Sequence, residues 1–328
     1  MKLSVVIPVY NGADFIQKSY NSILNQNLQE FEIIFVDNNS RDRSVENIKR
    51  LMQEDSRISL YYQKKQGAGP ARNLGINMAK GEYIYLFDVD DEIYPNAIKT
   101  MISVLETHAN VDAVFGKMNK SHQGISDIPA LEGDTLKVVL KEKPYWGLKW
   151  FSNLKHVVGP PAFLYRASVF NEIGAYNNEL RLGEDTAFDI KLGMLKNIAF
   201  LDMHVYLYFK HDTSTTGIAK KQTPRAFMIW PRLIKEHLPF YLTYKTPIKF
   251  KSLLFSQLFQ AMGRQLVFTK GLQNRYLLKR QLFDDLKDVS IPFSIRLYLS
   301  ILVILPFETL RKVYGYYVVP YTVKRLTK

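Results

Sequence analysis

The chain alternates between short apolar runs and longer stretches in which apolar side chains recur with helical spacing. Leu3 to Val9, Phe31 to Val36 and Ile58 to Tyr62 are predominantly apolar. Such runs are typical of strands buried on both faces of a parallel sheet. Between the second and third runs, residues 45–52 carry apolar side chains every three or four positions, which predicts a helix. Strands that alternate with helices predict right-handed βαβ units and an α/β fold with a mostly parallel sheet.

Polar side chains follow three of the predicted strands at the point where each strand ends. Tyr10-Asn11 follows the first strand, Asp37-Asn38-Asn39 follows the second, and Asp88-Val-Asp90-Asp91 follows a later run, Tyr83 to Phe87. In open α/β sheets, ligands bind outside the carboxyl ends of the strands. We therefore expect these three loops to meet at one edge of the sheet.

The acidic loop after Phe87 crowds three carboxylates, Asp88, Asp90 and Asp91, into four positions. Carboxylates this close repel one another unless a positive charge lies among them. Mg²⁺ and Mn²⁺ prefer carboxylate oxygen, and Mg²⁺ commonly keeps positions open for substrate phosphates. The loop is therefore a candidate metal-diphosphate site. Taken alone, the pattern is equally consistent with a solvated acidic turn.

The glycine-rich stretch Gln66 to Gly75 precedes the acidic strand. It lacks the Gly-Lys-Ser/Thr of a Walker loop, and it does not follow the first strand as a dinucleotide fingerprint does. Its glycines would allow the backbone to approach a ligand closely. Arg72 can pair either with a phosphate group or with a neighbouring acidic loop, and the sequence favours neither interpretation.

Three features of the middle of the chain have a structural and a functional interpretation. For Trp146 and Trp150, core packing is favoured over stacking on a sugar ring. Glu184-Asp185 begins a predicted helix, where acidic side chains alone favour the positive end of the helix dipole. His211 follows a strand-like segment, and a single histidine is more often structural than a ligand.

Composition and charge divide the chain into two parts. The 328 residues are 47% hydrophobic and 23% charged, as in globular proteins, and they include no cysteine for a disulfide or thiolate site. Residues 1–215 hold 24 Lys/Arg and 26 Asp/Glu, whereas residues 216–328 hold 20 and 5. Because the first residues do not resemble a signal peptide, we expect a cytoplasmic protein. No nucleic-acid-binding motif accompanies the basic part.

The basic part predicts amphipathic helices. Apolar residues follow helical spacing between lysines and arginines at Phe250, Leu253, Leu254, Leu258, Met262 and Leu266. Such helices can pack on the catalytic domain, lie on an anionic membrane surface, or do both. The alternative is a helical subdomain with a solvated basic face. The longest charge-free run, Leu297 to Phe307, is shorter than the roughly 20 residues that a spanning helix needs. We expect this run to be interfacial or buried.

Taken in order, these motifs resemble those of family 2 glycosyltransferases, which have the GT-A fold. The resemblance rests on Val5-Val-Ile-Pro-Val-Tyr-Asn11, Phe35-Val-Asp-Asn-Asn-Ser40, Gly69-x-Ala-Arg-Asn73, Phe87-Asp-Val-Asp-Asp91, Gly174-Ala-Tyr-Asn177, Gly183-Glu-Asp185 and His211-x-x-Ser214. It covers about the first two-thirds of the chain. One departure is Asn38, where the family usually has a second aspartate.

The resemblance implies a role for each matching residue. Val9 and Tyr10 would lie by the nucleotide base, Asp37 would accept a hydrogen bond from it, and Asp88 would approach the ribose. Further contacts to the nucleotide sugar are implied for Pro8, Asn11, Asn39, Arg72 and Val89. Asp90 or Asp91, with His211 as a further ligand, would hold Mn²⁺ or Mg²⁺ on the diphosphate. Asp185 would be the general base, and Glu184 would orient or replace it.

The resemblance also implies an activity and a domain organisation. We expect a GT-A catalytic domain in residues 1–215, with a nucleotide-sugar half at about 1–110 and an acceptor half at about 111–215, followed by a helical region in 216–328. The expected enzyme is inverting and metal-dependent. It moves a sugar from a UDP-sugar to a lipid-linked or polymeric glycan at the inner face of the cell membrane. A non-catalytic relative with the same fold and a sugar nucleotidyltransferase are the alternatives.

Overall fold

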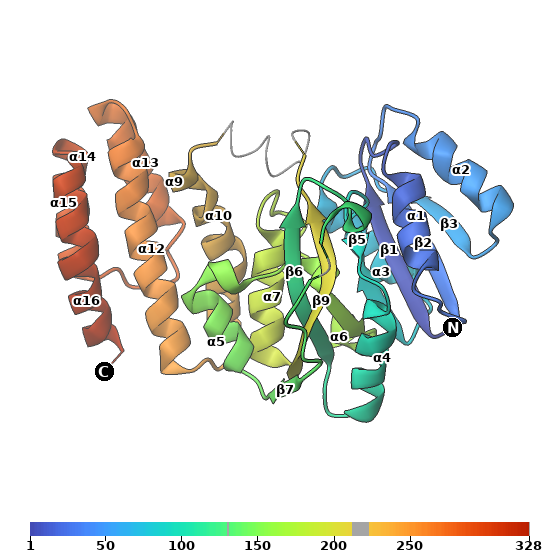
Figure 1. Ribbon diagram of the computed structural model, residues 1–328. Helices are drawn as coiled ribbons and strands as arrows, with labels where there is room; N and C mark the ends of the chain where they lie inside the picture. Colours follow the sequence, from blue (N-terminus) through green and yellow to red (C-terminus); the bar gives the residue numbers. More distant parts are fainter. Residues whose placement is uncertain (130, 212–222, 328) are drawn as a thin grey trace. The chain divides into compact units, whose positions relative to one another are not determined.

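The computed structural model describes residues 1–129, 131–211 and 223–327, and it divides into two compact units, residues 1–214 and 215–328 (Figure 1). Ser214 of the His211-x-x-Ser214 motif and the predicted boundary between residues 215 and 216 lie outside the described residues.

The strands of the first unit form one sheet, which has nine strands among the described residues. They are β1 (Leu3–Val9), β2 (Phe31–Asp37), β3 (Ile58–Tyr62), β4 (Tyr83–Leu86), β5 (Glu92–Ile93), β6 (Ala113–Ser121), β7 (Val138–Lys141), β8 (Phe163–Arg166) and β9 (Ile198–Phe209). β1 and β3 have the predicted bounds, and β2 and β4 differ from the prediction by one residue at the carboxyl end. The apolar runs explain the agreement for β1, β2 and β4, which are almost entirely buried, whereas the edge strand β3 is only partly covered.

The order of the strands is β3-β2-β1-β4-β8-β6-β9-β5, with β7 paired to β9 off this path. β3, β2, β1 and β4 are parallel neighbours. β8 is antiparallel to both β4 and β6, and β6 is parallel to β9. The carboxyl ends of β1, β2 and β4 therefore lie at the same edge of the sheet. The predicted α/β class, with helices flanking a largely parallel sheet, is confirmed.

Helices connect and cover these strands (Figure 1). They are α1 (Ile16–Leu24), α2 (Ser44–Glu54), α3 (Ala68–Met78), α4 (Ala97–Thr107), α5 (Tyr145–Ser152), α6 (Ser168–Ile173) and α7 (Glu184–Leu195), with short 3₁₀ turns η1 (Ile125–Asp127), η2 (Leu154–His156) and η3 (Pro160–Ala162). α3 packs on β1 and β2, and α4 packs on β6 and β9. α5 and α7 pack on each other so closely that Gly147 and Gly193 leave no room for a Cβ atom.

The middle of the chain is more regular than its sequence predicts. The sequence predicts a strand from Val111 to Gly116; the observed β6 begins two residues later and ends five residues later, and residues 117–150 also hold β7 and most of α5. The segment Val157 to Tyr165, which the sequence predicts to be a strand entered through a turn, is a 3₁₀ turn followed by β8. The core role of the two tryptophans is confirmed: both are buried, and both rings pack against Phe115.

The second unit is helical throughout its regular segments (Figure 1). It contains α9 (Arg225–Met228), α10 (Trp230–Arg232), η4 (Leu233–His237), α11 (Leu238–Thr243), α12 (Ile248–Phe268), α13 (Leu272–Asp284), α14 (Phe293–Ile304), α15 (Glu308–Val313), η5 (Tyr314–Val318) and α16 (Val319–Leu326). η4 and η5 are single π-helical turns. Among the described residues, no helix combines the length and the apolar content that crossing a membrane requires.

The apolar stripe predicted for residues 250–266 is the core of this unit. Phe250, Leu254, Leu258, Met262 and Leu266 are all fully buried in α12, which packs against α13, α14 and α16. The structure therefore shows that this stripe packs within its own unit. The exposed apolar side chains of the unit lie at the two ends of α12, Ile248 and Phe268, and on other segments.

Candidate active site

The three loops that follow β1, β2 and β4 meet at the carboxyl edge of the sheet. The backbone N–H of Asn38 donates a hydrogen bond of 2.8 Å to the carbonyl oxygen of Val9, which joins the ends of β1 and β2. A Cβ atom on Gly12 would lie only 3.0 Å from the side chain of Val89, so the loop after β1 also touches the acidic loop after β4. The sheet topology thus brings together the three segments that the sequence predicts to be close.

Asn38 holds the loop after β2 to two later segments. Its side-chain nitrogen donates hydrogen bonds of 2.8 Å to the backbone carbonyl oxygens of Gln63 and Lys65. Its side-chain oxygen accepts a hydrogen bond of 2.7 Å from the backbone N–H of Gly67. An ionised aspartate has no donor and could make only the last of these bonds. The departure from the usual family residue is therefore explained by the local hydrogen bonds.

The predicted nucleotide-contacting residues of the first two loops differ in how accessible they are. Tyr10 is half exposed, whereas Val9 and Asp37 are buried and Pro8 is partly buried. Asn11 and Asn39 adopt positive φ angles of 50° and 66°. Their side chains hold backbone groups: the Asn11 oxygen accepts from the amide of Arg41 at 2.8 Å, and the Asn39 amide donates to the carbonyl of Lys64 at 3.0 Å.

The three carboxylates of the acidic loop have different surroundings. Asp91 is only 2% exposed and accepts a hydrogen bond of 3.0 Å from the backbone of Phe209. Asp90 is more accessible, and its carboxylate lies 2.7 Å from Nε2 of His211. Asp88 is similarly accessible and accepts a bond of 2.6 Å from Arg72. The neighbouring Val89 is almost buried. Asp91 therefore anchors the loop to β9, whereas Asp88 and Asp90 face accessible space.

His211 comes from the end of β9 and is held beside the acidic loop by aromatic rings. Its ring centroid lies 5.1 Å from that of Phe15 and 6.0 Å from that of Phe209. These contacts bring a residue that is 121 positions away in sequence against Asp90. The position of His211 beside Asp90 is compatible both with a structural role and with a role as a ligand.

The carboxylates of this loop are short of positive charge. Burial raises the pKa of Asp90, and the charge of Asp88 raises it further, while His211 acts in the opposite direction. Burial, Asp88 and Asp90 together raise the pKa of Asp91 well above its usual range. No group of three or more acidic or histidine side chains surrounds a common point in residues 1–129, 131–211 and 223–327. Asp90 and His211 offer one oxygen and one nitrogen donor, which suits a cation that takes its other ligands from a bound diphosphate.

Arg72 of α3 connects the acidic loop to α7. It is 4% exposed; one of its terminal nitrogens lies 2.6 Å from Asp88 and the other 3.1 Å from Glu184. Its guanidinium group also lies over the ring of Tyr176, 5.4 Å from the centroid. The structure therefore shows the carboxylate pairing that the sequence left as one of two interpretations. The contact of Arg72 with a ligand stays a prediction.

Asn73 follows Arg72 in α3, and its side chain binds the loop that precedes α7. Its side chain accepts a hydrogen bond of 2.9 Å from the amide of Tyr176 and donates one of 2.8 Å to the carbonyl of that residue. A Cβ atom on Gly69 would lie in ordinary contact, 3.5 Å, with both Tyr176 and Glu184. The Gly69-x-Ala-Arg-Asn73 motif thus positions α7 against the acidic loop.

Glu184 and Asp185 form the first turn of α7. Gly183 precedes them with φ +74°, a conformation that favours glycine. Burial and the neighbouring charge of Asp185 raise the pKa of Glu184 to about 7, although Arg72 opposes the shift. Asp185 is partly exposed, and its carboxylate accepts a hydrogen bond of 2.6 Å from the amide of Thr186. One acid is therefore enclosed and paired, and the other is accessible.

Asp189 is a buried acid in this region that the sequence analysis did not identify. It is fully buried, and neither of its carboxylate oxygens has a hydrogen-bond partner among the described residues. Burial, and then the charge of Asp185, raise the pKa of Asp189 well above the usual range, which favours the protonated carboxyl group. The hydroxyl groups of Tyr165 and Tyr176 lie in the same buried region. The signal was an acid four residues after Asp185, within the apolar segment Phe188-Asp-Ile190.

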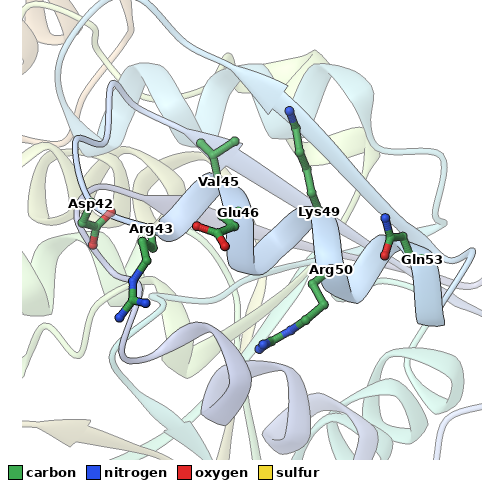
Figure 2. Close-up of a pocket in the computed structure, with 7 residues that line it drawn as sticks. All are labelled: Asp42, Arg43, Val45, Glu46, Lys49, Arg50 and Gln53. Atoms are coloured by element: carbon green, nitrogen blue, oxygen red, sulfur yellow. The ribbon is translucent and has the colours of Figure 1, made fainter.

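A shallow hollow of about 580 Å³ lies along α2 and contains none of the predicted site residues (Figure 2). It is lined by side chains of both charges: Asp42, Arg43, Val45, Glu46, Lys49, Arg50 and Gln53. Acidic and basic groups alternate along the helix, as on a solvated helix face. The carboxyl edge of the sheet, where the acidic groups lack compensating charge, is the better candidate for chemistry.

Comparison with known proteins identifies similar sequences. The family described as Glycosyl transferase family 2 matches residues 4–174. Glycosyltransferase GlyG of Streptococcus pneumoniae serotype 4 is 28% identical over 221 residues, which cover 65% of this chain and 72% of GlyG. An uncharacterized glycosyltransferase of Haemophilus influenzae is 28% identical over 238 residues, which cover 62% of this chain and 95% of the relative.

Solved structures show the same fold. S. aureus TarS 1–349 in complex with UDP-GlcNAc has a TM-score of 0.64 at 19% identity, over 99% of this chain and 92% of TarS 1–349. The mannosyltransferase PcManGT from Pyrobaculum calidifontis, in complex with GDP-Man and Mn²⁺, has a TM-score of 0.51 at 15% identity, over 99% and 87%. The fold expected from the motifs, GT-A, is therefore the fold observed.

Proposed function

The chain belongs to glycosyl transferase family 2, and we propose that it is an inverting, metal-dependent enzyme that uses a UDP-sugar. The acceptor we propose is a hydroxyl group of a lipid-linked or polymeric glycan in cell-surface polysaccharide biosynthesis. Glycosyl transfer from a nucleotide sugar follows from the family itself. The observation that carries the finer proposal is the contact of Arg72 with both Asp88 and Glu184, which brings the acidic loop and the first turn of α7 together.

On the donor side, the loops at the carboxyl edge of the sheet would hold the nucleotide. Tyr10 and Val9 would lie against the base, and Asp37 would accept a hydrogen bond from its N–H group. Asp88, fixed by Arg72, would accept a hydrogen bond from the ribose. The TarS complex with UDP-GlcNAc supports UDP as the nucleotide.

The cation we propose is Mn²⁺ or Mg²⁺, and Asp90 and His211 would hold it. When bound, the cation neutralises charge on the departing diphosphate. We assign Asp90 rather than Asp91 as the main ligand, because Asp91 is enclosed and bonded to the backbone of Phe209. The PcManGT complex with Mn²⁺ supports a divalent cation in this fold.

On the acceptor side, Asp185 would be the general base. Its carboxylate would take the proton from the acceptor hydroxyl as that oxygen forms a bond to the anomeric carbon. The bond from this carbon to the diphosphate oxygen breaks in the same step, and its electron pair leaves with UDP. A single displacement inverts the configuration at the anomeric carbon. Glu184, paired with Arg72, would fix the start of α7 and so the position of Asp185.

We also propose that the enzyme works as a peripheral protein on the cytoplasmic face of the cell membrane, where a lipid-linked acceptor would be found. The support is the excess of basic over acidic residues in 216–328, 20 against 5. Anionic lipids attract such segments.

The test is release of UDP from a panel of UDP-sugars by the full chain with Mn²⁺. We expect one donor to be turned over, and Asp185→Asn to bind UDP normally while transfer falls by about 100-fold or more. Asp288→Asn, which alters an exposed acid of the second unit, is the matched control. Turnover by Asp185→Asn at the wild-type rate would exclude Asp185 as the base. Absence of both binding and turnover for every UDP-sugar would refute the proposal.

A further inference from the structure

We propose that the outer face of α14, α15 and α16 is a docking surface for an anionic lipid bilayer. The inference rests on the proposed function only for its purpose, which is to bring the enzyme to a lipid-linked acceptor. Binding to lipid can be measured without turnover.

The first part of this surface is a stripe on α14. Phe293 is 78% exposed, and Leu297 and Ile304 are more than half exposed. Successive members are four and seven residues apart, so they lie on one side of the helix. The opposite side carries Ile295 and Leu299, which are fully buried. α14 therefore has two apolar faces, and only one of them is covered.

The second part is a stripe of tyrosines on η5 and α16. Tyr316 and Tyr317 are 74% and 72% exposed, and Tyr321 is also largely exposed. Val319 and Val323 on the other side of the same helix are buried. Large apolar side chains that are exposed one at a time are ordinary, but stripes of them indicate an interaction surface.

The two stripes lie on adjoining parts of one surface. α14 and α16 both pack on α12, and they also touch each other through the hydroxyls of Ser294 and Thr322, 2.8 Å apart. The rings of Tyr298 and Tyr314 stack beside this contact, with centroids 5.4 Å apart. Since both stripes point away from α12, neighbouring helices present them side by side. Figure 1 shows α14, α15 and α16 as a layer over α12.

The charge around the stripes is almost entirely positive. Residues 289–328 contain six Lys/Arg and a single acid, Glu308. Glu308 is already paired with Arg311, at 2.7 Å. Arg296, Lys312, Lys324 and Arg325 are exposed among the apolar side chains. Exposed apolar groups ringed by basic groups match the interface of an anionic bilayer, with acyl chains below and phosphate groups above.

This combination favours lipid over a second copy of the chain. In a symmetric dimer the same patch meets itself, so the basic residues of both copies would be brought together and would repel. Tyrosine, which has an apolar ring and a polar hydroxyl, is enriched at the boundary between lipid and water. Because no described helix is long and apolar enough to span a membrane, the contact we propose is peripheral.

The experiment is co-sedimentation of the full chain with vesicles. We expect binding to phosphatidylcholine vesicles that contain about 30% phosphatidylglycerol, and binding that weakens as salt is added. Phe293→Ser/Tyr317→Ser/Tyr321→Ser should lower the partition coefficient by about tenfold or more. Lys312→Gln/Lys324→Gln/Arg325→Gln should lower it by about fivefold per charge at low salt.

Controls separate loss of binding from loss of folding. Leu140→Ser/Tyr145→Ser, which alters exposed apolar side chains of the first unit, should bind as the wild type does. Tyr317→Phe/Tyr321→Phe keeps the rings and should retain binding. UDP release by each variant in solution reports on the catalytic unit.

The outcomes are distinguishable from those of the proposed function. Lipid binding without binding or turnover of any UDP-sugar would refute the enzyme proposal and leave this one standing. UDP release without lipid binding would overturn the docking surface. Undiminished binding by the triple serine variant would also overturn it. A wild-type dimer that this variant converts to a monomer, with no lipid binding, would assign the surface to a second copy.

Discussion

Two groups of acidic side chains, one in the loop after β4 and one on α7, lie on either side of Arg72. Their crowded negative charge is compensated in different ways. Asp88, Asp90 and Asp91 follow a strand, and among the described residues Arg72 pairs with Asp88 and His211 lies against Asp90. Glu184, Asp185 and Asp189 lie on α7, where burial raises the pKa of Asp189 and so favours its protonated form, and the pKa of Glu184 is raised to about 7. The first group therefore suits an added cation, whereas the second suits bound protons. A donor diphosphate and an acceptor proton require these two properties.

The largest expected effect on stability comes from replacing Arg72, which contacts both groups of acids. Arg72→Met leaves Asp88 and the enclosed Glu184 without their common partner, and removing one member of a buried ion pair costs about 3 to 5 kcal/mol. Urea unfolding should show this loss, and UDP release should fall with it. Arg50→Met, on the exposed face of α2, is the control. A loss of less than about 1 kcal/mol would show that the groups are independent.

The next largest effect concerns how protonation of Glu184 on α7 makes the stability of the protein depend on pH. An acid whose pKa is raised by folding stabilises the fold while protonated, so its contribution is complete below the usual value of 4.5 and is lost as pH rises through about 7. Wild-type stability should therefore fall by about 3 kcal/mol, relative to Glu184→Gln, between these pH values. Unfolding at several pH values measures this difference.

Glu54→Gln, at the exposed end of α2, should follow the wild type in that series. Parallel pH curves for the wild type and Glu184→Gln would mean that Glu184 is ionised across the range. The contrast between the two groups of acids would then be lost.

A smaller effect tests the cation preference of the strand-end group. Asp90→Asn replaces a charged ligand, so the gain in UDP affinity on adding Mn²⁺ should fall by about tenfold or more. Asp91→Asn keeps an oxygen that can accept from the amide of Phe209 and should retain most of that gain. Calorimetric titration with and without Mn²⁺ measures both. The reverse ranking of the two variants would make Asp91 the main ligand.

The smallest effect is expected at Asp189. Since burial favours the neutral form of this side chain, Asp189→Asn should change stability by less than about 1 kcal/mol and leave the pH profile of UDP release unchanged. Asp189→Leu removes the polar group from beside Tyr165 and Tyr176 and should cost more. A displaced pH profile for Asp189→Asn would indicate that Asp189 carries charge in the active protein.

The sequence predicts the strand-end half of this site better than the α7 half. β1 is recognisable because a nearly continuous apolar run has few alternatives to a buried strand, and the sheet topology then brings the loops after β1, β2 and β4 together. The partners of Arg72 are not predictable in this way, because Glu184 is 112 residues away and local patterns carry no such information. Asp189 was missed although its place in the apolar segment Phe188-Asp-Ile190 is a local signal of burial.

The second unit shows a different limit of pattern reasoning. The spacing of Phe250, Leu254 and Leu258 predicts an apolar stripe, but it does not say whether protein or lipid covers that stripe. The structure buries it in α12 and leaves the stripe of α14 exposed. Only tertiary packing distinguishes the two, because both helices satisfy the same periodicity.

The hydrogen bonds of Asn38 constrain how this chain could diverge. A mutation to the aspartate that its relatives usually carry would set a carboxylate against the carbonyl oxygens of Gln63 and Lys65. That change would be tolerated only after segment 63–67 had been remodelled. Consensus engineering, which restores common residues one by one, would therefore fail at this position unless the two segments were exchanged together.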